Sequence, residues 1–126
     1  MEGRAPQESG PGAPERALLS LLGLAARARA LAMGTDMVRG AARDGKVAAA
    51  VLAGDASPTQ ARKLVPLLQA RGIPFAVCSN QAELGAAVGK GPVSAIGITD
   101  PGFARRAMEL AAVPSLPQDR GGGEPY

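Results

Sequence analysis

The chain has 126 residues, a net charge of +3, no histidine and a single cysteine. This length suits one domain with a modest core. No apolar run approaches the ~20 residues of a membrane span, and the lone Cys78 excludes an internal disulfide. The single cysteine fits a reducing cytoplasm. The missing histidine removes the commonest general base, and no Cys/His cluster could form a zinc site. We therefore predict a cytoplasmic, non-enzymatic protein with no membrane partner, no metal and no cofactor.

The two ends of the chain, residues 1–14 and 114–126, are rich in proline and glycine and have little to bury. We therefore predict disordered tails around one domain of residues 15–113. Apolar side chains at helical spacing predict a first helix over residues 15–29. They are Leu18, Leu21, Leu22 and Ala25. A second helix is expected from Gly34 to Gly45, where glycine suits the position after a helix end.

Three apolar segments bounded by turn residues are predicted as strands. They are residues 47–53, which should be buried on both faces, 73–78 and 93–99. Capping boxes at 57–60 and 80–83 and an Asp100-Pro101 pair start three more helices, ending near Arg71, Gly89 and Ala112. Pro66 is expected to kink the first of these helices. Strands joined by helices indicate right-handed crossovers. The predicted fold is a single-domain, three-layer α/β/α sandwich with a small mixed central sheet.

The start of the second helix is the best candidate for ligand binding. A helix N-terminus presents unpaired N–H groups and a partial positive charge, which suit a phosphate. Asp36, Arg39 and Arg43 share the face opposite the expected core, and Lys46 follows the helix. Residues 16–112 carry a net charge of +6, which favours an anionic partner such as nucleic acid. A solvated face with Asp36 paired to Arg39 explains the same pattern.

The only cysteine is interpreted as a small hydrophobic core residue, because Cys78 falls within a predicted buried strand. The segment "GAAVGKG", residues 85–91, looks like a phosphate-binding loop but lacks one residue of the required spacing and ends a helix. Neither feature therefore changes the expectation that the protein is not an enzyme.

Six motifs occur in a familiar order and spacing: "LLGLA", "GTD", "GDAS", "GIPF", "LGAAVGK" and "ITDPGFA". Together they resemble the ribosomal protein L-seven-Ae/L-thirty-e family of RNA-binding proteins, and most closely its bacterial YlxQ-like branch, over residues 17–112. Members of the family share an α/β/α sandwich, and many bind kink-turns, which are sharply bent RNA elements with tandem sheared G·A pairs. The resemblance implies a monomeric ribonucleoprotein component in a ribosome or translation context. Its partner would be a structured RNA, with ribosomal RNA as one candidate.

The resemblance also implies an RNA-binding surface, which in the family joins the start of the second helix to an apolar loop before the last strand. The matching positions are Gly34, Thr35, Asp36 and Met37 in the helix start and Gly91, Pro92, Val93 and Ser94 in the loop. Basic residues nearby are expected to add salt-dependent affinity for phosphates. They are Arg39, with Arg29, Arg43, Lys46 and Lys90 as weaker candidates.

This chain departs from the family pattern at three places. Asp36-Met37 replaces a typical Asn-Glu pair, and methionine cannot accept a hydrogen bond from a guanine as glutamate can. Gly40 stands where a basic residue is usual, and Arg29-Ala30 stands where Gly-Lys is usual. Two hypotheses therefore stay open: a protein that binds kink-turn-like RNA, and a protein-interaction adaptor that keeps the fold but has lost specific RNA recognition.

Overall fold

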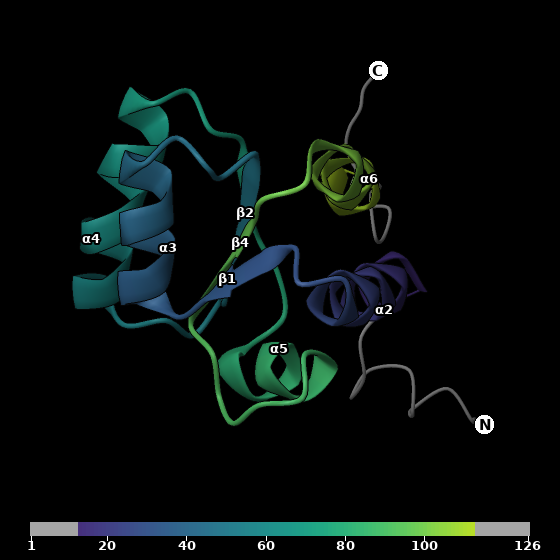
Figure 1. Cartoon of the computed structure of the whole chain (residues 1–126). Helices are drawn as coiled ribbons and strands as arrows, with labels where there is room; N and C mark the ends of the chain where they lie inside the picture. Colours follow the sequence, from purple (N-terminus) through teal and green to yellow (C-terminus); the bar gives the residue numbers. More distant parts are fainter. Residues whose placement is uncertain (1–12, 113–126) are drawn as a thin grey trace, which may run out of the picture.

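The computed structural model describes residues 13–112, and the predicted tails fall outside this range except for Ala13 and Pro14, which begin the first helix. The elements follow one another as α2 (Ala13–Arg27), β1 (Leu31–Met33), α3 (Thr35–Arg43), β2 (Ala49–Leu52), α4 (Pro58–Ala70), β3 (Phe75–Val77), α5 (Gln81–Ala87), β4 (Ala95–Ile98) and α6 (Pro101–Ala112). In Figure 1, α3 and α4 cover one face of the sheet and α2 and α6 cover the other. The predicted α/β/α sandwich is confirmed.

The sheet has the order β1-β4-β2-β3 and is mixed, because β4 runs antiparallel to both of its neighbours while β2 and β3 are parallel. The strand β1 was not predicted, because its three residues become a strand only through pairing with β4. It was also wrong to expect a crossover between all successive strands. The chain leaves α5 at the end of the sheet where β2 stops, with Leu52 opposite Ala95, so β4 must run back along β2.

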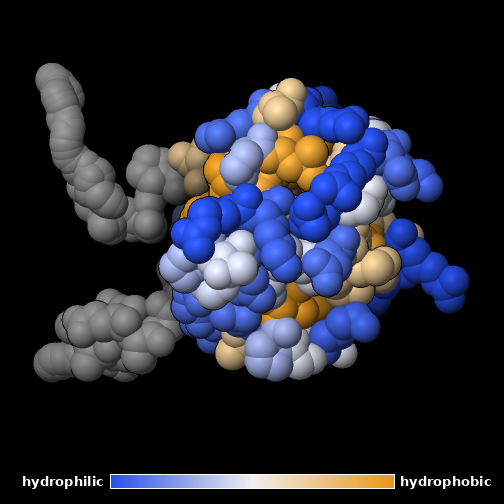
Figure 2. Space-filling view, turned by 90° about the vertical axis from the view of Figure 1, so that its left-hand side faces the viewer, coloured by the Kyte–Doolittle hydropathy of each residue, from blue (hydrophilic) through white to orange (hydrophobic). Residues whose placement is uncertain are grey.

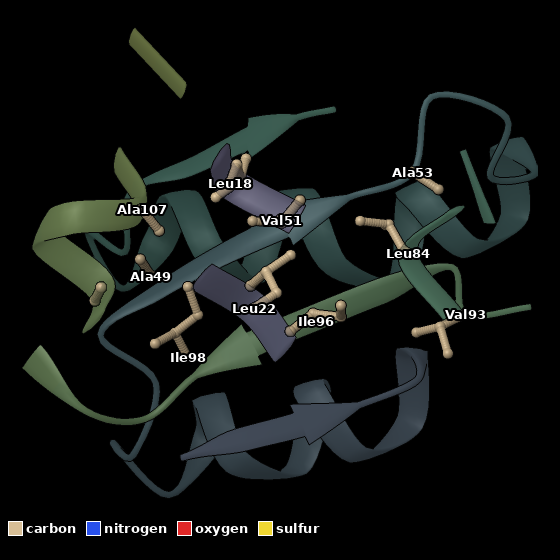
Figure 3. Packing of buried hydrophobic residues seen from close by; sticks show 11 residues of the cluster. Leu18, Leu22, Ala49, Val51, Ala53, Leu84, Val93, Ile96, Ile98 and Ala107 are labelled. Atoms are coloured by element: carbon tan, nitrogen blue, oxygen red, sulfur yellow. The ribbon is translucent and has the colours of Figure 1, made fainter. Parts of the chain in front are cut away.

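Side chains of the central strands alternate between two hydrophobic clusters, one on each face of the sheet. In β2, Ala49 and Val51 join the cluster beneath α2 and α6, whereas Ala50 and Leu52 join the cluster beneath α3 and α4. All four residues of this strand are buried, which confirms its predicted burial on both faces. Figure 3 shows the first cluster, with Leu18 and Leu22 of α2 over Val51, Ile96 and Ile98.

Helix starts follow the sequence signals more closely than strand ends do. In the predicted capping box before α4, Ser57 Oγ accepts from the Gln60 N–H at 3.1 Å and the Ser57 N–H donates to Gln60 Oε1 at 3.0 Å. The helix continues beyond Pro66 to Ala70. By contrast, β3 ends at Val77, so Cys78 is half-buried just after the strand and not inside it as predicted.

Candidate functional site

A groove of about 490 Å³ opens at the end of the sheet where α3 begins. Eight predicted site residues line it: Gly34, Thr35, Asp36, Met37, Lys90, Pro92, Val93 and Ser94. Three further residues also line it: Met33, Gln60 and Gln81. The structure thus brings the helix start and the loop before β4 together, as the family resemblance implied.

Gly34 turns the chain from β1 directly into α3. Its N–H donates to the Ala95 carbonyl at 2.8 Å, which ends the strand pairing, and it then serves as the N-cap of the helix with φ +96° and ψ 151°. A Cβ at Gly34 would meet no atom within 4 Å, so the positive φ and not lack of space favours glycine here. The tight turn sets the first residues of α3 at the edge of the groove.

The two halves of the groove are joined by one side-chain hydrogen bond. The hydroxyls of Thr35 in α3 and Ser94 in the loop lie 2.8 Å apart. Ser94 is only 6% exposed, so it has little access to water as an alternative partner. This bond holds the loop against the helix start.

Replacing Ser94 with alanine should leave the Thr35 hydroxyl unpaired and loosen the loop. Loss of such a bond costs about 1 kcal/mol, and more where the remaining group is buried. We expect a fall in the free energy of unfolding of roughly 1–2 kcal/mol, measured by urea denaturation. The control is the Thr35→Val, Ser94→Ala double variant. If its loss in free energy of unfolding equals the sum of the losses in the two single variants, the hydroxyls are not coupled.

The N-terminus of α3 differs from those of the next three helices. Ser57, Asn80 and Asp100 cap α4, α5 and α6 by accepting from the N–H groups of Gln60, Glu83 and Phe103 at 2.8–3.1 Å. Gly34 has no side chain and makes no such bond, and no other side-chain cap of α3 is found within residues 13–112. The first amides of α3 are therefore available to a partner in the groove.

Two exposed apolar side chains flank these amides. Met37 is 64% exposed, and Pro92 is exposed on the loop. Val93, in contrast, is 7% exposed and packs in the cluster beneath α2 and α6. Any stacking contact in the groove would therefore involve Met37 and Pro92, while Val93 supports the loop from below.

Most of the predicted basic residues lie away from the groove. Lys90 is exposed at its rim, but Arg43 and Lys46 lie at the opposite end of α3, about 13 Å from the helix start. Arg29 is exposed in the turn before β1, which also begins at that far end of the sheet. These residues do not line the groove.

Arg39 is half-buried on α3, and its Nε is buried without a hydrogen-bond partner. Within residues 13–112 no ion pair joins it to Asp36, so the i, i+3 pair expected for a purely solvated face does not form. The helix thus presents a cation whose charge is not satisfied by a carboxylate of the described chain.

Gln60 and Gln81 were predicted only as residues of helix starts. Gln60 belongs to the capping box of α4, while the Gln81 N–H donates to Asp55 Oδ1 at 2.8 Å and its side-chain amide donates to the Asp55 carbonyl at 3.1 Å. No local signal marked them as groove residues. Their shared position appears only when α4 and α5 begin at the same end of the sheet as α3.

Cys78 lies outside the groove, next to a small pocket with Glu15 and Ser79. Burial, aided by the nearby Glu15 carboxylate, raises the pKa of the Cys78 thiol from 9.0 to about 11. The thiol therefore stays protonated at neutral pH and is a poor nucleophile. Residues 13–112 contain no group of three potential metal-ligating side chains, and no described helix is long and apolar enough to cross a membrane.

The profile of the ribosomal protein L7Ae/L30e/S12e/Gadd45 family matches residues 16–108. The chain belongs to this family. The match spans the domain from α2 to α6, including every element that lines the groove. The family assigned on the six sequence motifs is thus confirmed.

Among individual L7Ae-family relatives, the RNA-binding protein YlxQ of Bacillus subtilis (strain 168) is 33% identical over 90 residues, which are 71% of this chain and 90% of that protein. This similarity supports the YlxQ-like branch. A solved protein of unknown function from Bacillus halodurans C superposes with a TM-score of 0.72 and 40% identity, covering 75% of this chain and 95% of that one. The Giardia lamblia 15.5kD RNA binding protein has the same fold at 20% identity, with a TM-score of 0.68 and coverage of 81% and 88%.

Proposed function

We propose that this protein is a non-catalytic RNA-binding protein that recognises a structured, kink-turn-like RNA through the groove at the start of α3. The observation that carries the proposal is the uncapped N-terminus of α3, which opens onto the groove while α4, α5 and α6 are capped by their own side chains. The names of the B. subtilis and G. lamblia proteins support RNA as the ligand. A ribosomal or translational RNA in the cytoplasm, bound by a monomer, is the context we propose.

The groove offers distinct contacts for a bent RNA. The amides of α3 and the Lys90 ammonium suit phosphate oxygens. The Asp36 carboxylate can accept hydrogen bonds from the N–H groups of a base edge. Met37 and Pro92 supply an apolar surface for an unstacked nucleotide, as RNA recognition commonly requires. These roles involve binding and no proton transfer or covalent step.

RNA association can be tested first on the protein as purified at low salt. We expect co-purifying RNA to raise the ratio of absorbance at 260 nm to absorbance at 280 nm. The RNA signal should dominate, because a protein with one tyrosine and no tryptophan absorbs weakly at 280 nm. Affinity for a kink-turn RNA should then fall as salt rises. Protein that is free of RNA and does not bind the kink-turn RNA at low salt would overturn the proposal and favour the adaptor hypothesis.

Arg39→Ala should weaken binding to every RNA tested, because within residues 13–112 the half-buried Arg39 has no carboxylate partner that would compete with a phosphate. We expect the magnitude of the slope of log K against log salt to fall by about 0.9, the contribution of one phosphate contact. A loss of discrimination between RNAs would instead indicate a base contact. Arg39→Lys, which keeps the charge, is the matched control, and unchanged affinity and selectivity in Arg39→Ala would show a solvated face.

A further inference from the structure

The two helices on one face of the sheet run side by side away from the groove. Both α3 and α4 contribute their first turns to the groove lining, and the helices pack against each other (Figure 1). The 13 residues of α4 span about 20 Å. The outer surface of this pair is therefore an extended face that starts at the groove.

This α3–α4 face, made by residues 35–46 and 58–71, carries an unbalanced charge. Its six basic residues are Arg39, Arg43, Lys46, Arg62, Lys63 and Arg71, and its acidic residues are Asp36 and Asp44. None of the six basic residues makes an ion pair within the described chain, whereas Arg106 on α6 pairs with Glu109 at 3.4 Å. Figure 2, which views this face, shows a broad band of hydrophilic side chains across it.

The shape and charge of the face suit a polymer of phosphates better than a small anion. The basic side chains, other than the half-buried Arg39, are exposed and spread along both helices. Double-stranded RNA is bound largely through its shape and its phosphates, and each neutralised phosphate adds affinity by releasing counterions.

We infer that the α3–α4 face is a second RNA-contacting surface, which binds the phosphate backbone of a duplex arm that continues from the RNA element in the groove. The inference rests on the proposed function, since the groove sets where the arm begins. It adds Arg62 and Lys63 on α4, and Arg71 at the C-cap of that helix, to the binding surface.

The test compares two kink-turn RNAs, one with short arms and one with an arm extended by one helical turn. The variant is Arg62→Gln, Lys63→Gln, which removes two exposed charges with residues that favour helix. The matched control is Arg105→Gln, Arg106→Gln, which removes the same charge from exposed positions on α6, across the sheet. Kd is measured for each protein and RNA between about 50 and 200 mM salt.

We expect wild type to bind the extended RNA more tightly than the short one, and the α4 variant to lose this advantage. For the extended RNA, the slope of log K against log salt should be smaller by about 1.8 in the α4 variant than in wild type. The affinity deficit of the variant relative to wild type should therefore shrink about tenfold between the lowest and the highest salt. The α6 control should behave as wild type.

Suppose that wild type binds the short RNA and that the α4 variant matches wild type on both RNAs. That outcome would overturn this inference alone and leave the face to another partner, such as an acidic protein. An equal loss in the α6 control would overturn it as a general charge effect. Failure of wild type to bind either RNA would overturn the proposed function as well.

Discussion

Gly85→Ala is expected to destabilise the protein and to disturb the groove. Gly85 is buried in α5, and a Cβ there would overlap the backbone carbonyl of Gly91 in the loop before β4. Because the obstacle is backbone, α5 and the loop must move apart. Overpacking of this kind costs about 1–3 kcal/mol, occasionally more, which lowers Tm by about 4–8 °C for each kcal/mol in a domain of this size.

Gly40→Ala is the matched control for this substitution. Gly40 is an exposed glycine inside α3, and a Cβ there would meet no atom within 4 Å. Alanine should stabilise the helix by about 1 kcal/mol. The melting temperatures of the two alanine variants, measured by calorimetry, should therefore shift in opposite directions from that of wild type. If Gly85→Ala melts at or above the wild-type temperature, the close packing of α5 against Gly91 is not a constraint on the fold.

The double change Met37→Glu, Gly40→Lys should increase selectivity for kink-turn RNA. It restores the residue types usual in the family at the two positions where this chain lacks them. Met37 is 64% exposed in the groove, and a Cβ at the exposed Gly40 would meet no atom within 4 Å, so neither change starts from a tightly packed position. A good contact to a base edge contributes about 1–3 kcal/mol of discrimination in DNA complexes. We therefore expect the ratio of affinities for a kink-turn and for an RNA without its G·A pairs to rise roughly tenfold or more.

Titration of both RNAs with wild type, Gly40→Lys and the double variant separates the two effects. The lysine alone should strengthen binding to both RNAs through phosphate contacts, whereas the glutamate should act only on the kink-turn. If the double variant binds the two RNAs with the wild-type ratio, the start of α3 does not meet the G·A pairs in the way that the family resemblance implies.

Helix starts and the most buried strand could be predicted from the sequence because their determinants are local. The capping box at Ser57 and Gln60 forms between residues three apart, and the apolar run of β2 needs no knowledge of its neighbours to be recognised as buried. The pairing of the α3 start with the loop at Ser94 came from the resemblance to the family and not from any pattern in the residues themselves. Whether the groove binds RNA stays a prediction.

Contacts between distant residues were decided only by the tertiary structure. Leu31 becomes part of a strand because Ile98 pairs with it, and Thr35 meets Ser94 across 59 positions of sequence. The half-buried state of Arg39 likewise depends on neighbours that helical periodicity does not reveal, so the sequence placed it only on the face opposite the core. Sequence by itself determined where helices begin and that the β2 segment is buried on both faces, since hydrogen bonds and apolar runs act within a few residues. It did not determine that β3 lies at the edge of the sheet with Val77 64% exposed, because the strand order sets the edge. The shared end of α3, α4 and α5, and with it the groove, arises from the order and direction of strands, which only packing of the whole chain decides.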